Sequence, residues 1–135
     1  MAAAFVGTWK LAGSENFDEY MKACGVGLIT RTTANQLKPS QVIAVDGDKI
    51  TIKTLSTFKN TEVSFTLGQE FEETTADGRK MKTTYKMDGA NLVADLKPIK
   101  DGDSASTYKR EITPEGMTMT LTVKDIVCLR KYVKE

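Results

Sequence analysis

Histidine is absent from the 135 residues, and only two cysteines are present. The chain therefore lacks the commonest general base and metal ligand of proteins, and Cys24 and Cys128 alone offer too few donors for a zinc site. Basic and acidic residues nearly balance, with 19 Lys and Arg against 18 Asp and Glu. Without a strong positive field, nucleic acid is not favoured as a partner. These shortages argue against metalloenzymes, histidine-dependent hydrolases and nucleic-acid-binding proteins.

Long hydrophobic runs and a basic leader are also missing. The apolar run of residues 1–6 carries no basic residue and is cut short by Gly7 and Lys10, which argues against a signal peptide and a membrane span. Two cysteines do not make the disulfide framework of a small secreted domain. We expect a cytoplasmic protein with reduced thiols, in which Cys128 is a small buried apolar group.

What the chain does contain is a series of short alternating segments. Its length and 40% hydrophobic content suit a single domain, residues 1–135, with a core of its own. Apolar and polar residues alternate over 49–53, 62–67 and 117–124, as expected of half-buried strands. Turn signals separate such segments: Asp46-Gly47, Asp77-Gly78, Asp88-Gly89, Asp101-Gly102 and Pro114-Glu115-Gly116. The pattern predicts an all-β meander of antiparallel hairpins, most economically closed into a barrel.

One region departs from this period. Between residues 16 and 24 the apolar positions recur every three or four residues, which predicts an amphipathic helix with Asn16 and Glu19 as a capping box and Gly25 at its end. A second helix is expected from about residue 27 to about residue 36, closed by Pro39. Such a helical hairpin, placed after the first strand, could cover one mouth of the barrel.

Permanent charges fall on inward faces of two predicted strands. In residues 126–132, Arg130 and Tyr132 share parity with Cys128, and in residues 107–112, Arg110 shares parity with Tyr108. A guanidinium does not lose its proton at ordinary pH, and its burial without a partner is costly. Two inward arginines and a tyrosine hydroxyl therefore indicate a socket for one carboxylate. The alternative for Arg130 is a structural ion pair with an inward acid such as Glu70 or Glu73.

Several segments, in order along the whole chain, resemble the cytosolic fatty-acid-binding protein family. They are Gly7-Thr8-Trp9-Lys10-Leu11, Asn16-Phe17-Asp18-Glu19-Tyr20-Met21, Asp46-Gly47-Asp48, Ser56-Thr57-Phe58-Lys59-Asn60-Thr61-Glu62, Leu67-Gly68-Gln69-Glu70-Phe71, Thr75-Ala76-Asp77-Gly78-Arg79-Lys80 and Arg130-Lys131-Tyr132. The resemblance implies a ten-stranded antiparallel up-and-down β-barrel of the β-clam type. It also implies a helix-turn-helix lid after the first strand and an internal cavity for one lipid.

The resemblance assigns roles to particular residues. The carboxylate binders of the family hold the acid group with two inward arginines and a tyrosine, which local matching places at Arg110, Arg130 and Tyr132. The cavity and portal positions are expected at Phe17, Tyr20, Met21, Val26 and Ala34 on the lid side, Phe58, Ala76 and Asp77 at the portal, and Pro39, Thr54, Ser56 and Arg79 in the wall. Packing of an ordinary amphipathic helix accounts for the apolar lid residues equally well.

We therefore expect a monomeric, non-enzymatic carrier of long-chain fatty acids, with the carboxylate inside and the tail toward the lid. The fatty acid is a non-covalent ligand, no cofactor is expected, and transient membrane contact through the helical lid is a further expectation. A retinoic acid carrier is the alternative ligand class, because retinoic acid carriers use a similar arginine and tyrosine arrangement. A lipid-dependent signalling or interaction module is the alternative functional class.

Overall fold

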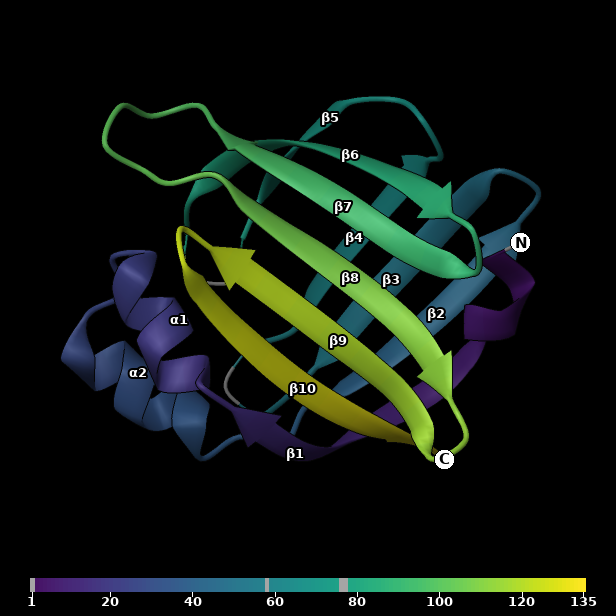
Figure 1. Ribbon diagram of the computed structural model, residues 1–135, viewed down its shortest axis with the longest axis horizontal. Coiled ribbons are helices and arrows are strands. Elements are labelled where there is room, and N and C mark those ends of the chain that lie inside the picture. The colour runs from purple at the N-terminus through teal and green to yellow at the C-terminus, as the bar shows by residue number, and fades with distance from the viewer. Residues whose placement is uncertain (1, 58, 76–77) are drawn as a thin grey trace.

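Ten antiparallel strands form a nearly closed barrel in the computed structural model, which describes residues 2–57, 59–75 and 78–135 (Figure 1). The strands are β1 (Gly7–Glu15), β2 (Ser40–Asp46), β3 (Lys49–Leu55), β4 (Thr61–Thr66), β5 (Phe71–Thr74), β6 (Lys80–Asp88), β7 (Asn91–Pro98), β8 (Ser106–Thr113), β9 (Gly116–Val123) and β10 (Ile126–Lys134). Strands that follow one another in sequence pair with each other, except β4 and β5, which are the two ends of the sheet. In addition, β1 pairs with β10. The predicted all-β barrel is confirmed.

The seam between β4 and β5 is spanned by side chains. Phe65 of β4 stacks on Tyr85 of β6 with ring centroids 3.9 Å apart, and Phe71 of β5 lies 5.5 Å from Phe65. Aromatic stacking adds to the free energy of area burial. Near the β4–β5 turn the seam is therefore held by a stack of three rings, together with a 2.8 Å backbone hydrogen bond from Gly68 to the Tyr85 carbonyl of β6.

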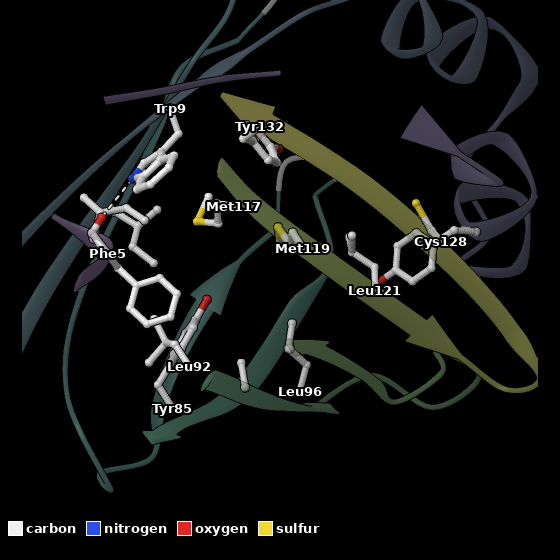
Figure 2. Close-up of a cluster of buried hydrophobic side chains, with 14 of the residues drawn as sticks. Phe5, Trp9, Tyr85, Leu92, Leu96, Met117, Met119, Leu121, Cys128 and Tyr132 are labelled. Carbon is white, nitrogen blue, oxygen red and sulfur yellow. Dashed lines mark hydrogen bonds between the residues drawn. The ribbon is translucent and has the colours of Figure 1, made fainter. Parts of the chain in front are cut away.

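One part of the hydrophobic core lies at the end of the barrel next to the N-terminus. Phe5, in a short 3-10 helix (Ala2–Phe5), is fully buried, and its carbonyl accepts a 2.9 Å hydrogen bond from the indole N–H of Trp9 (Figure 2). Met117 of β9 and Leu92 of β7 pack against this cluster, as Figure 2 shows. All four apolar residues of the predicted alternation in β9 are buried, so that prediction is confirmed.

Two helices cover the other end of the barrel, as predicted (Figure 1). They are α1 (Phe17–Ala23), which packs on β10, and α2 (Leu28–Asn35), which packs on α1. The expected capping box is wrong. Asn16 has a left-handed backbone (φ 61°) and makes no side-chain cap; its amide instead donates a 3.2 Å hydrogen bond to the carbonyl of Val127. The side chain thus fastens the start of α1 to β10. Within the described ranges, no helix has the length and apolar character needed to cross a membrane.

Gly116 allows β9 to approach β10 beside the predicted socket. Its φ is 147°, and a Cβ at this position would overlap the backbone carbonyl oxygen of Tyr132. Neither the backbone conformation nor the contact suits a residue with a side chain.

We predict that Gly116→Ala lowers the free energy of unfolding by about 2 kcal/mol or more, because it combines backbone strain with a backbone clash. Urea titration measures the change. Gly13→Ala is the matched control, since a Cβ there meets no atom within 4 Å. Equal stability losses in the two variants would contradict the proposed clash.

Candidate ligand-binding site

A cavity of about 230 Å³ lies inside the lid end of the barrel. The helices, the inward faces of the strands and the loops between them all supply parts of its wall. The lining residues are Phe17, Tyr20, Met21, Cys24, Val26, Thr30, Ala34, Leu37, Pro39, Gln41, Thr54, Ser56, Lys59, Thr61, Thr75, Arg79, Tyr108, Met119, Leu121, Arg130 and Tyr132. Most lining residues on the lid side are apolar, while the polar lining groups come mainly from the strands and from the loops that join them, as is typical of a site for an amphipathic molecule.

The structure places most of the predicted cavity residues on this wall. Those that line it are Phe17, Tyr20, Met21, Val26, Ala34, Pro39, Thr54, Ser56, Arg79, Arg130 and Tyr132. The three portal positions Phe58, Ala76 and Asp77 lie outside the described residues. Arg110 does not line this cavity; it lines an adjoining hollow described below.

Arg130 is 6% exposed and lies at the base of the lid. Its guanidinium carbon is 3.7 Å from the centroid of the Phe17 ring on α1, and its Nη1 donates a 3.1 Å hydrogen bond to the Ser14 hydroxyl of β1. A cation over an aromatic face is stabilised electrostatically. Among the described residues no acid lies within ion-pair distance of Arg130, so the alternative ion pair with Glu70 or Glu73 is wrong.

Arg110 faces a second hollow of about 520 Å³ that extends to the β4–β5 seam. The residue is 3% exposed, its Nε donates a 3.2 Å hydrogen bond to Gln41 Oε1, and its buried Nη1 has no partner among the described residues. Met119 pairs with Arg110 on one side and with Arg130 on the other, so the two arginines are about 10 Å apart at their Cα atoms, two strand spacings. Met119 lines both hollows.

Gln41 of β2 joins the two arginine regions. Its amide Nε2 donates to the hydroxyl oxygen of Tyr132 at 3.2 Å and contacts the Met119 sulfur at 3.6 Å, while its Oε1 accepts from Arg110. Gln41 was not among the residues predicted from the sequence, although its parity with buried Ile43 in β2 is a signal for an inward position. Other lining residues that were not predicted as ligand contacts are Cys24, Thr30, Leu37, Lys59, Thr61, Thr75, Tyr108, Met119 and Leu121.

Burial controls the ionisation of groups around the cavities. Burial raises the pKa of Tyr20 to about 12 and that of Tyr108 well above its ordinary value, so both phenols are neutral near pH 7. Burial also raises the pKa of Glu73, against the opposite effects of the nearby Thr83 hydroxyl and the Arg110 charge. The pKa of Tyr85 is raised by burial too, and Arg110 again acts in the opposite direction. The guanidinium groups of Arg110 and Arg130 therefore lie in an interior whose phenols Tyr20 and Tyr108 stay neutral near pH 7.

The cysteines are free thiols in buried positions. Burial raises the pKa of Cys128 to about 11, so the thiol is protonated near pH 7 although Arg130 acts in the opposite direction. A protonated thiol is a poor nucleophile and metal ligand. No cluster of three or more metal-ligating side chains occurs in the part of the chain that the structure describes.

The model of the lipocalin / cytosolic fatty-acid binding protein family matches residues 6–135. The chain belongs to this family. The sodium/calcium exchanger regulatory protein 1 of Doryteuthis pealeii is a relative, 52% identical over 132 residues, which are 98% of this chain and 97% of that protein.

Solved structures of family members have the same barrel. A protein named REP1-NXSQ fatty acid transporter is 50% identical with a TM-score of 0.94, over 99% of this chain and 98% of that one. The fatty acid binding protein of Schistosoma mansoni, solved in complex with arachidonic acid, is 36% identical with a TM-score of 0.92, over 98% and 97% of the two chains. The predicted membership of the fatty-acid-binding protein family is confirmed.

A polar cluster joins the two lid helices of this family member. Asp18 Oδ1 of α1 accepts hydrogen bonds from Asn35 Nδ2 at 2.9 Å and Arg31 Nε at 3.1 Å, both from α2. Arg31 also donates to the Val26 carbonyl at 2.7 Å. The Asn35 bond is the largest effect and lowers the pKa of Asp18; burial acts in the opposite direction, and the Arg31 hydrogen bond and the charges of Arg31 and Lys22 lower the pKa further. Because the folded pKa lies below 3.8, this stabilisation is present above pH 3.8 and is lost as pH falls through the folded pKa.

We predict that Asp18→Ala loosens α2 from α1 and raises amide hydrogen exchange in α2 about two- to fivefold at neutral pH, the size expected of a partly exposed pair. Exchange followed by NMR measures the effect. Glu19→Ala is the control, since Glu19 is exposed on the same helix. In the wild type, acidification below the folded pKa should reproduce the loosening. Equal exchange rates in α2 of the two variants would contradict the role of the cluster.

Proposed function

We propose that this protein binds one long-chain fatty acid without covalent attachment and carries it through the cytoplasm. In this proposal the carboxylate is held by Arg110, Arg130 and Tyr132, and the acyl tail extends toward α1 and α2. The observation that carries the proposal is the pair of buried arginines without an ion-pair partner among the described residues.

The electrostatics support an anionic head group. Burial of two guanidinium groups is costly unless each is paired and hydrogen-bonded, yet Arg110 Nη1 has no partner within the described ranges. A carboxylate could accept from both arginines across Met119 and from the Tyr132 hydroxyl. Each such charged hydrogen bond is worth about 1.5 to 3 kcal/mol.

The cavity wall supports an apolar tail. Phe17, Met21, Val26 and Ala34 face the cavity from the lid. Transfer of each methylene of an acyl chain from water contributes about 0.8 kcal/mol, so the tail supplies most of the affinity and the arginines supply the preference for an acid. Together the two hollows reach the range of about 300 to 1,000 Å³ typical of ligand sites.

Catalysis is not part of this proposal. The buried, protonated Cys128 is a poor nucleophile, and histidine is absent from the sequence. Similar proteins carry names that refer to fatty acid binding and transport. We therefore propose a monomeric binding protein that has no cofactor.

We predict that Arg130→Gln or Arg110→Gln weakens oleate binding about tenfold or more, because a charged hydrogen bond is lost. The affinity for methyl oleate should change less than about threefold, since the ester carries no charge to pair. Isothermal titration calorimetry with both ligands measures the two affinities.

Lys131→Gln is the matched control for this experiment, because it removes one positive charge from the exposed face of the same strand. Equal losses for acid and ester would contradict the carboxylate socket. Displacement of a bound fluorescent fatty acid separates the ligand classes: we expect oleate to displace it at lower concentration than retinoic acid does. The reverse order would favour the retinoic acid carrier.

The lid also supports transient contact with membranes during fatty acid transfer. Leu28 and Ile29, in the first turn of α2, are 68% and 85% exposed, which is unusual for large apolar side chains. The side chain of Lys22 is exposed on neighbouring α1 and carries a positive charge that suits anionic lipid. We propose that this end of the lid touches the bilayer when the ligand is exchanged.

We predict that Leu28→Ser combined with Ile29→Ser slows oleate transfer to anionic phospholipid vesicles about fivefold, because less apolar surface enters the interface. Oleate affinity should be unchanged. Stopped-flow transfer of a fluorescent fatty acid measures the rate. Val133→Ser, on an exposed strand position 44% accessible, is the control. An unchanged transfer rate in the double variant would exclude contact through α2.

A lipid-dependent interaction module is a second candidate function. The observation that favours it is the 52% identical relative whose name describes regulation of a sodium/calcium exchanger. In this candidate, ligand binding would change the lid surface that a partner recognises. The same exposed residues of α2 would then serve recognition as well as ligand transfer.

A further inference from the structure

Gln41 is the one buried amide that touches both halves of the proposed carboxylate site in the described structure. It is 4% exposed, and its side chain projects from β2 to Arg110 of β8, Met119 of β9 and Tyr132 of β10. All of its hydrogen-bonding groups are used: one N–H goes to the tyrosine oxygen, the other to the methionine sulfur, and the carbonyl accepts from the arginine.

Chemistry fixes the orientation of this amide. A guanidinium can only donate, so the group of Gln41 that faces Arg110 Nε at 3.2 Å must be the carbonyl oxygen. The amide nitrogen therefore faces Tyr132, where it donates to the hydroxyl oxygen at 3.2 Å. Arg110 thus fixes the orientation of the Gln41 amide. The amide in turn makes the Tyr132 hydroxyl oxygen a hydrogen-bond acceptor on the side that faces Gln41.

We infer that Gln41 is a positioning residue that makes the socket selective for a carboxylate, an inference that rests on the function proposed above. By donating to Tyr132, Gln41 occupies a lone pair of the phenol and leaves its proton available to donate. No acceptor for that proton lies within hydrogen-bond distance among the described residues. The cavity that Tyr132 lines is where such an acceptor can enter.

The same amide holds Arg110. Its bond to Nε fixes the plane of the guanidinium and leaves Nη1 without a partner in the described part of the chain. A ligand oxygen then meets donors from both residues, which costs little rearrangement at the moment of binding. Gln41 neutralises neither of them, since an amide carries no net charge.

This neutrality explains why an amide and not an acid suits the position. A glutamate would pair with Arg110, cancel its charge and accept the Tyr132 proton itself. The ligand would lose a hydrogen-bond donor and face a negative charge. An uncharged side chain of similar length, such as methionine, would leave the tyrosine proton free to rotate.

The test compares Gln41→Glu and Gln41→Met with wild type, by calorimetry with oleate and methyl oleate at pH 8. We expect Gln41→Glu to weaken oleate binding about tenfold or more and Gln41→Met about three- to tenfold. Methyl oleate affinity should change less than about threefold in both, because the ester responds to cavity shape but carries no charge. Gln69→Glu is the control for the added charge, since Gln69 is exposed.

A double-variant cycle shows whether Gln41 acts through the tyrosine. Tyr132→Phe removes the proton that Gln41 directs, so the effect of Gln41→Met on oleate should be at least threefold smaller in the Tyr132→Phe background. Independent effects, or equal losses for acid and ester in the Gln41 variants, would mean that Gln41 only packs and would overturn the inference.

The outcomes also separate this inference from the function on which it rests. If Arg130→Gln and Tyr132→Phe leave the preference for oleate over its ester unchanged, the carboxylate site itself is wrong and the inference falls with it. If those variants reduce the preference but Gln41→Glu does not, the site stands and Gln41 is not its positioning residue.

Discussion

The constraint on which the structure depends is the presence of two permanent positive charges inside a hydrophobic barrel. Arg110 and Arg130 are 3% and 6% exposed, and neither has an ion-pair partner among the described residues. Contacts within the protein offset part of the desolvation penalty of these charges. Gln41 accepts a hydrogen bond from Arg110, and the Ser14 hydroxyl and the Phe17 ring contact Arg130. The positive charges that remain unpaired face the cavities, which is why we propose an anionic ligand there.

The two ends of the barrel differ in how tightly they are packed. The end beside the N-terminus is a packed core around Phe5, Trp9 and Met117 and resembles the interior of any small domain. The lid end is hollow, and its wall is mostly apolar on the lid side and more polar on the strands and loops. Stability is thus concentrated at one end and the proposed binding site at the other, so changes at the site need not unfold the core.

The sequence predicted features that follow from local periodicity and failed where a contact joins distant segments. Alternation placed Arg130, Tyr132 and the methionines of β9 inward, and turn signals marked the hairpins. The ten-strand count and the closure between β1 and β10 came from the family resemblance. Asn16 was misread because its bond to Val127 crosses 111 residues, and Gln41 was missed because its partners lie on three other strands.

The unpaired seam between β4 and β5 has a mechanical consequence. Every other strand boundary is a ladder of backbone hydrogen bonds, whereas this one is bridged by the rings of Phe65, Phe71 and Tyr85. No ladder of hydrogen bonds joins β4 to β5, so a change in the girth of the barrel breaks the fewest strand-to-strand hydrogen bonds at this seam. The seam borders the hollow that Arg110 lines, so widening at this seam would enlarge that hollow first.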